Sequence, residues 1–267
     1  MTNWHRITLL PFSILWFALG AAAAEDAGPD PSSKMLAAQS YPGGNLNLSR
    51  FPTVLGHNLT SNLFTRGNLL PFLIGSAAAL TIAPADQEIS RSMSNHAHEF
   101  GNTGEIVGPI ITSSIAGGAF LASRLTKNEH FRPFGYTLAQ AYVTNAILTK
   151  GIKYATHRMR PDGSASDSFP SGHTSSAFAV ATVVTNYYGK KWGIPLYVFS
   201  GLVGASRIEK RQHWPSDIIA GAALGYISGR TAILGTKQES SRPRKARLMI
   251  MPTFGSDWRG ISAFISY

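Results

Sequence analysis

Three short stretches between residues 153 and 217 combine basic, imidazole and carboxylate side chains at spacings that could bind an anion. The first, KYATHRMRP, places Lys153 and Arg160 seven residues apart, so on a helix both would lie on nearly the same face. Pro161 disfavours helical backbone at Arg160, which puts the pair at a helix C-terminus, where cations are stabilised. The pair could bind one anion, although a solvated basic helix end is the ordinary interpretation of this stretch alone.

The second stretch, FPSGHTSSAF, predicts a helix that begins after Pro170, with Ser171, Gly172 and His173 at its start. The first N–H groups of a helix have no partner inside it, and Gly172 allows an anion to approach the backbone closely. This helix start could therefore cradle a phosphate, with His173 at the rim. An N-cap serine followed by an exposed imidazole is the alternative interpretation.

The third stretch, SRIEKRQHWPSD, contributes Ser206, Arg207, His213 and Asp217. Pro215 suits the first turn of a helix, so Asp217 is expected near a helix N-terminus, four residues after His213. A carboxylate there could accept the Nδ1–H of His213 and leave Nε2 unprotonated for nucleophilic attack. A structural His–Asp pair that caps the helix stays open as an alternative. A metal site is disfavoured, because the nearby basic side chains would repel a divalent cation.

Together the stretches supply two imidazoles, three cations, the N–H groups of a helix start and one orienting carboxylate. This set describes an anion site equipped for phosphoryl transfer with no metal or other cofactor. The chain contains no cysteine, which excludes thiolate nucleophiles, disulfides and Cys-ligated zinc.

The runs K-x6-RP, PSGH and SR-x5-H-x3-D, in this order, resemble the three-part signature of the type 2 phosphatidic acid phosphatase superfamily. That superfamily includes bacterial class A acid phosphatases, membrane lipid phosphatases and vanadium haloperoxidases. The resemblance implies an all-α bundle in which the three motifs meet at one end. It implies that His213 is a nucleophile that forms a phosphohistidine, that Asp217 orients it and that His173 protonates the leaving oxygen. The phosphate-binding residues that it implies are Lys153, Arg160, Ser171, Gly172 and Arg207.

Residues beside the motifs receive weaker interpretations. On a helix, His157 and Arg158 would point away from the face of Lys153, so we expect them at the surface or behind the site. Trp214 could wall an apolar leaving group or serve packing. The charged run 209–211 is expected to be a solvated loop.

The elements that must position these motifs are helices. Residues 67–233 contain six uncharged stretches separated by charged or Pro/Gly-containing links, which predict a six-helix bundle and an all-α fold. Gln140, Asn145 and Asn186 would be unusual facing lipid and ordinary inside a protein-packed bundle. The predicted stretches are 67–85, 106–123, 133–149, 174–189, 192–206 and 218–229.

The two ends of the chain differ in character from this helical part. Residues 1–24 predict a cleaved signal peptide, since a basic start precedes an apolar run and four alanines. Residues 25–66 are dense in Pro, Gly, Asn and Ser and predict an irregular arm. Residues 234–267 predict a basic tail with a short β-hairpin.

Composition narrows the partners. The formal net charge is +10 and 14% of residues are charged, which excludes a disordered polyelectrolyte and favours anionic ligands. We find no nucleic-acid-binding module. We expect an exported, periplasmic phosphatase for phosphate monoesters or lipid (di)phosphates, with membrane contact, or alternatively an integral inner-membrane enzyme. A vanadium-dependent haloperoxidase, or a catalytically silent envelope-binding protein of the same fold, is the alternative function.

Overall fold

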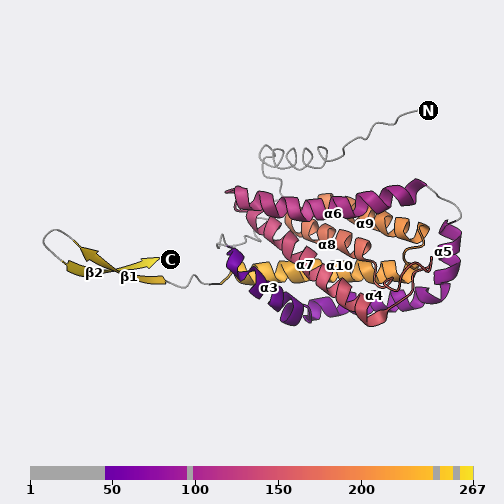
Figure 1. Ribbon diagram of the computed structural model, residues 1–267, viewed down its shortest axis with the longest axis horizontal. Coiled ribbons are helices and arrows are strands. Elements are labelled where there is room, and N and C mark those ends of the chain that lie inside the picture. Colours follow the sequence, from indigo (N-terminus) through magenta and orange to yellow (C-terminus); the bar gives the residue numbers. More distant parts are fainter. Residues whose placement is uncertain (1–45, 95–98, 243–246, 255–258, 267) are drawn as a thin grey trace, which may run out of the picture.

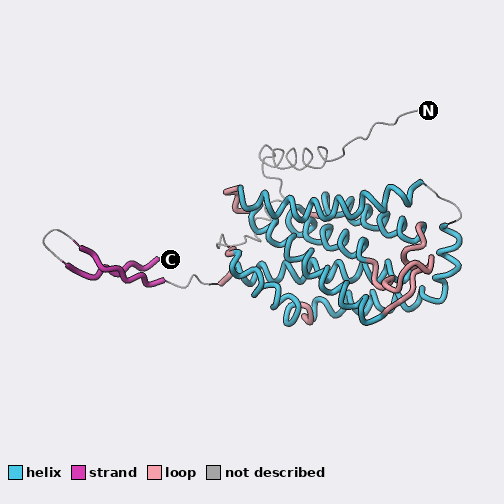
Figure 2. The backbone as a smooth tube through the Cα atoms, in the orientation of Figure 1, coloured by secondary structure: helices cyan, strands magenta, loops and turns pink. Residues whose placement is uncertain are grey.

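The computed structural model describes residues 46–94, 99–242, 247–254 and 259–266, and most of these residues are helical (Figures 1 and 2). Six long helices run side by side along the molecule, and two short helices, α3 (Phe51–His57) and α5 (Asp86–Ser94), flank them (Figure 1). The long helices are α4 (Arg66–Ile82), α6 (Glu99–Leu125), α7 (Phe131–Thr156), α8 (Gly172–Tyr188), α9 (Lys190–Glu209) and α10 (Pro215–Ser240).

Each of the six predicted stretches overlaps one long helix, and the all-α prediction for this part of the chain is confirmed. The predicted number of helices was too small, because α5 and the helical segment 48–62 were not expected. Segment 48–62 had been assigned to the irregular arm on its turn-forming residues. Its proline, Pro52, lies in the first turn of α3, where proline is tolerated, and its asparagines Asn58 and Asn62 are buried.

Helix α10 is the centre of the bundle, since it packs against α8, α4 and α7, and α8 packs in turn against α9. Glycines let α8 and α10 approach closely. A Cβ on Gly225 would lie 2.1 Å from the backbone oxygen of Ser175, and one on Gly229 would lie 2.7 Å from Cβ of Thr182. Larger residues fill the space toward α7, where Phe134, Leu138, Val180, Val183, Tyr187 and Ile233 form the apolar core.

Gln140 and Asn145, in the middle of α7, form hydrogen bonds inside the protein. Gln140 is fully buried; its Nε2 donates to the backbone oxygen of Phe51 at 2.9 Å and its Oε1 accepts from Asn58 at 3.2 Å. Asn145 is also buried and donates to Ser175 Oγ at 3.0 Å. The expectation of a protein-packed environment for Gln140 and Asn145 is therefore confirmed, and Gln140 fastens the N-terminal helical segment to the bundle.

One face of α4 is apolar and uncovered. The segment Arg66–Ser94 is long and apolar enough to cross a bilayer, with 17% of its most apolar window buried in the protein. Pro215–Ser240 passes the same test, but 50% of its window is buried, as the centre of the bundle requires. A run of exposed large apolar residues on one helix is typical of a membrane or protein contact. The large apolar residues on α4 that are more than half exposed are Leu69, Leu70, Phe72, Leu73, Ile74 and Leu80.

The strands β1 (Arg247–Phe254) and β2 (Arg259–Ser266) pair antiparallel, with Arg247 opposite Ser266 and Phe254 opposite Arg259. The predicted signal peptide, residues 1–24, lies outside the described residues, as does the arm up to residue 45.

Candidate active site

The three motifs meet at one end of the bundle. The C-termini of α7 and α9 and the N-termini of α8 and α10 lie there, joined by the loops 157–171 and 210–214 (Figures 1 and 2). The backbone N–H of Asp162 donates to the oxygen of Arg211 at 3.0 Å and joins the two loops. The backbone N–H of Ser171 donates to the oxygen of Asp217 at 3.1 Å and joins the first loop to α10. Residues up to 64 positions apart in the chain are thus held together as one unit (217 − 153 = 64).

Lys153 and Arg160 converge, but not by the predicted route. Helix α7 ends at Thr156, and His157 takes left-handed backbone angles with φ 44° as its C-cap, so Arg160 lies in the following loop and shares no helix face with Lys153. Both cations instead reach Asp167. Arg160 Nε donates to Asp167 Oδ1 at 2.8 Å, and Lys153 Nζ donates to the Asp167 backbone oxygen and lies 4.0 Å from Oδ2.

The start of α8 has the form predicted from PSGH. Ser171 is the N-cap residue with extended backbone, and Gly172 and His173 follow in the first turn. Ser171 is fully buried and its Oγ lies 3.0 Å from Thr174 Oγ1, whereas Gly172 and His173 are half-buried. The serine side chain therefore braces the turn, and the turn's N–H groups and the imidazole of His173 remain near the surface of the site.

His213 and Asp217 are both buried, but the carboxylate is not the nearest acceptor of the imidazole. His213 Nδ1 lies 2.6 Å from the backbone oxygen of Ser168 and 3.7 Å from Asp217 Oδ2. A carbonyl oxygen can only accept, so Nδ1 carries the proton and Nε2 is unprotonated. The expected tautomer is obtained, but through Ser168, because Asp217 Oδ2 is already engaged by the hydroxyl of Ser168 and by the N–H of Trp214 at 2.8 Å.

Arg158, which we expected at the surface or behind the site, proves to be a central contact of Asp217. Its Nη1 donates to Asp217 Oδ1 at 2.6 Å and to Ser216 Oγ at 2.8 Å, and its Nη2 donates to Asp86 Oδ2 at 2.7 Å. Asp86 is 4% exposed and also accepts from the backbone N–H of Ser216 at 2.9 Å. The αL turn at His157 redirects Arg158 toward α10, and no periodicity in the sequence signals that turn.

Arg207 is 2% exposed and sits beside the nucleophile candidate. Its Nη2 donates to Gln212 Oε1 at 2.7 Å, and the same oxygen accepts from Arg160 Nη1 at 3.2 Å. Gln212 thus bridges two guanidinium groups from different motifs. Sequence reasoning did not single out Gln212, and its position directly before His213 was the available signal.

The electrostatics of the imidazoles follow from this crowding of cations. Burial and then the positive charges of Arg207, His213, Lys153 and Arg160 lower the pKa of His173 to about 4. Burial lowers the pKa of His213 as well, against the raising effect of Asp217. In the empty site both rings are therefore neutral near pH 7, which suits His213 as a nucleophile and withholds the proton of His173 until an anion binds.

We therefore expect kcat/KM and kcat to fall at different pH values. A proton donor works only below its pKa, and His173 in the free enzyme has a pKa of about 4, so kcat/KM should fall as pH rises through the acidic range. A bound phosphate dianion offsets the surrounding positive charge and raises the pKa of His173, so the fall in kcat should lie at higher pH. The measurement is both profiles for the wild type and for His173→Gln with one substrate. If the variant keeps both falling limbs, His173 is not the group that titrates.

Within the described residues, no three or more His, Asp or Glu side chains are grouped so that they could hold a metal ion.

Comparison with known proteins gives one family. Residues 131–240 match the PAP2 superfamily. The chain is 44% identical over 80 residues to the lipid A 1-phosphatase of Porphyromonas gingivalis. The aligned segment covers 29% of this chain and 18% of that protein. The chain is also 33% identical over 117 residues to the undecaprenyl-diphosphatase BcrC of Bacillus subtilis. This second alignment covers 41% of this chain and 60% of that protein.

A solved structure, the first transmembrane PAP2 type phosphatidylglycerolphosphate phosphatase from Bacillus subtilis, covers 67% of this chain and 96% of that chain at 24% identity, with a TM-score of 0.48. The chain spans less than two thirds of the length of either curated relative above. The matched segment runs from the start of α7 to the end of α10 and contains all three motifs. Over residues 131–240, this chain is therefore similar to the PAP2 superfamily.

Proposed function

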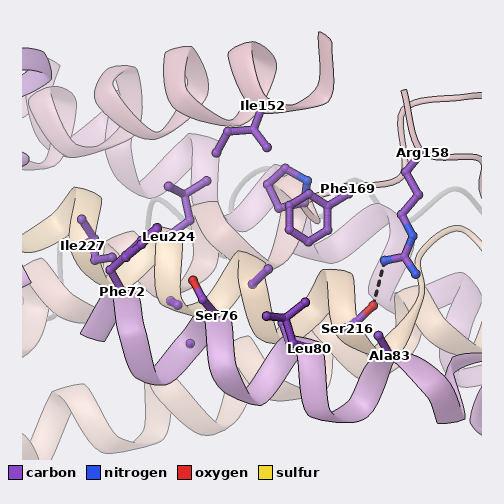
Figure 3. Close-up of a pocket in the computed structure, with 15 residues that line it drawn as sticks. Phe72, Ser76, Leu80, Ala83, Ile152, Arg158, Phe169, Ser216, Leu224 and Ile227 are labelled. Atoms are coloured by element: carbon purple, nitrogen blue, oxygen red, sulfur yellow. Dashed lines mark hydrogen bonds between the residues drawn. The ribbon is translucent and has the colours of Figure 1, made fainter. Parts of the chain in front are cut away.

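We propose that this protein is a metal-independent phosphatase that removes phosphate from a lipid phosphate at a membrane of the cell envelope, through a phosphohistidine on His213. The observation that carries the lipid part is an apolar groove that opens beside the candidate site (Figure 3). The named relatives, a lipid A phosphatase and an undecaprenyl-diphosphatase, support a phosphorylated lipid as the substrate class.

The groove has a volume of about 500 Å³ and lies between α4 and α10, with Ile152 of α7 above them (Figure 3). Phe72 and Leu80 of α4 and Leu224 and Ile227 of α10 give it apolar walls. Small residues open the middle, where Ser76 and Ala79 of α4 face Ala220 and Ala223 of α10. A space of this size and chemistry suits part of a hydrocarbon tail and offers little to a small polar ester.

One end of the groove reaches the phosphate-binding motifs. Phe169 and Pro170, which directly precede the α8 cradle, line it, as do Arg158 and Ser216 (Figure 3). A lipid whose tail lies along α4 would therefore bring its phosphate toward Ser171 and His213. The uncovered apolar face of the same helix would lie in the bilayer that supplies the lipid.

The reaction begins with attack of His213 Nε2 on phosphorus while the bond from phosphorus to the ester oxygen breaks. Lys153, Arg160 and Arg207, with the N–H groups at Gly172, offset the charge on the other phosphate oxygens, which is the largest contribution expected from such a site. His173 gives its proton to the departing lipid oxygen. Water then attacks the phosphohistidine, His173 takes back a proton, and inorganic phosphate leaves with His213 neutral again.

The direct test is phosphate release by the purified protein in EDTA, with a panel of phosphatidic acid, an isoprenoid diphosphate, lipid A and a soluble aryl phosphate. We expect release from at least one lipid at a higher kcat/KM than from the aryl phosphate. Bromide oxidation with vanadate and peroxide tests the haloperoxidase alternative on the same preparation. If no ester is hydrolysed, or if a divalent metal is needed, the proposal is wrong.

A substitution that fills the groove should impair the kinetics of lipid substrates and leave those of soluble substrates unchanged. Ser76→Trp places a large ring between α4 and α10, so we expect KM for the best long-chain substrate to rise by about tenfold or more, because a few buried methylenes are lost. Turnover of the aryl phosphate should not change. The matched control is Ala78→Trp on the exposed side of the same helix, outside the groove. Equal effects of the two variants would show that the groove does not hold the tail.

A further inference from the structure

Asp167 holds two of the three cations assigned to phosphate binding. Its Oδ1 accepts from Arg160 Nε at 2.8 Å, its Oδ2 lies 4.0 Å from Lys153 Nζ, and its backbone oxygen accepts from the same ammonium group. It belongs to none of the three motifs and lies in the loop between α7 and α8. Its side chain is 47% exposed, so solvent or a ligand can reach the carboxylate.

A carboxylate and a phosphate make the same kind of contact with these cations. Both present anionic oxygens, and arginine and lysine bind either one through charge-assisted hydrogen bonds. Arg160 donates from Nε to Asp167 and from Nη1 to Gln212. A phosphate must therefore displace one of these acceptors, or bind the remaining N–H groups of Arg160 beside the negative charge of Asp167. In either case Asp167 weakens the binding of an anion.

The ionisation of Asp167 is consistent with this role. Partial burial acts to raise the pKa of Asp167, but the hydrogen bond from Arg160 and the charges of Lys153 and Arg160 outweigh it and hold the pKa below its usual value. The carboxylate is therefore charged at neutral and mildly acidic pH, where a phosphate ester also carries negative charge.

We propose that Asp167 is an internal anion that occupies the phosphate-binding cations of the empty site and lowers the affinity of the site for every phosphate group, including the product. The proposal rests on the assignment of Lys153 and Arg160 as phosphate ligands. Inorganic phosphate has no tail to bind the groove, so the competing carboxylate makes it the ligand that leaves most readily. Asp167 therefore limits product inhibition.

The test is the affinity of the site for inorganic phosphate and for vanadate in Asp167→Asn, which keeps the shape and removes the charge. We expect both inhibition constants to fall by about 3- to 10-fold, since the pair that is lost is partly exposed. KM for the lipid should fall with them, and kcat should fall or stay the same as product release slows. Asp167→Ala removes the same charge and should give the same direction. Circular dichroism and the melting temperature verify that each variant is folded.

The matched control is Asp162→Asn in the same loop. Among its described hydrogen bonds, the Asp162 side chain accepts only from Ser164, at 2.9 Å from the backbone N–H and 2.7 Å from the hydroxyl. Asp162→Asn therefore removes an equal charge, which acts on Arg160 only at a distance, and breaks no hydrogen bond to the cations. The proposal is overturned if the inhibition constants rise in Asp167→Asn, since Asp167 would then be positioning the cations. It is equally overturned if the two variants behave alike.

Calorimetric titration with vanadate keeps this result distinct from the proposed function, because binding needs no turnover. If the wild type hydrolyses no ester but binds vanadate, and Asp167→Asn binds vanadate more tightly, the proposed phosphatase function is contradicted and the role of Asp167 as an internal anion is supported. A wild-type enzyme that is active while Asp167→Asn binds no more tightly supports the phosphatase and contradicts the internal anion. A wild-type protein that neither turns over nor binds contradicts both.

Discussion

Replacement of His213 by asparagine is expected to lower phosphate release by on the order of 10⁴-fold or more, because the covalent step has no other route. His213 is 3% exposed, and the Ser168 carbonyl accepts from its Nδ1–H, which leaves Nε2 unprotonated for the proposed attack. An asparagine amide nitrogen has no lone pair available for attack on phosphorus. The measurement is the steady-state rate with the best lipid substrate, together with a search for the base-stable phosphoprotein in samples quenched during turnover.

The control for this change is His157→Asn, which removes an exposed imidazole from the neighbouring loop. His157 has φ 44°, and asparagine tolerates left-handed backbone, so this variant should fold and keep its rate. Phosphoprotein that accumulates in the wild type and is missing in His213→Asn identifies the nucleophile. Wild-type turnover in His213→Asn would contradict the mechanism outright.

The second large effect is expected at Arg207. Arg207→Gln removes a buried cation that, in the proposed mechanism, stabilises the developing charge on phosphorus. The loss of one such electrostatic contact typically costs about 10²- to 10³-fold in kcat. Vanadate binding should weaken in parallel, because five-coordinate vanadate resembles the transition state. The melting temperature of the empty protein should hold or rise, since Arg207 and Arg160 donate to the same oxygen of Gln212 and their like charges repel.

Arg211→Gln is the matched control for Arg207→Gln. Arg211 is exposed, lies four residues further along the chain in the loop after α9, and donates to the backbone oxygen of Pro161 at 2.9 Å. We expect at most a small change in kcat for this variant. If Arg207→Gln and Arg211→Gln lose activity equally, the effect belongs to general surface charge, and Arg207 is not a transition-state contact.

The helical architecture was predictable because apolar stretches bounded by charged links carry their own signal of length and period. The segment 48–62 was not, since its helices depend on tertiary partners. Asn58 is a poor helix former, and its burial against Gln140, 82 residues away, is what stabilises it. Propensity cannot report a hydrogen bond that exists only after the bundle has assembled.

The candidate site likewise has a part that was predictable from the sequence and a part that was not. Side-chain types and spacing along the chain predicted which groups would meet, and those groups do meet at one end of the bundle. The contacts that orient them were not predictable. The acceptor of His213 is a backbone carbonyl, which every residue has, and Arg158 reaches Asp217 only because the chain reverses at His157. Asp86, which accepts from the backbone N–H of Ser216, lies 130 residues before it in the chain, so its place in the site was not predictable either.

The close fit between α8 and α10 has a consequence for how this protein can be redesigned. A Cβ on Gly221 would lie 2.8 Å from the backbone oxygen of Ser171, and the N–H of Ser171 is bonded to the oxygen of Asp217, so the cradle and the nucleophile belong to one rigid body. Helix α4 touches this body through small residues and carries no reacting group. A library that aims at new leaving groups should therefore randomise the groove residues of α4 and leave the glycines of α10 unchanged, because α10 lines the same groove but also carries Asp217.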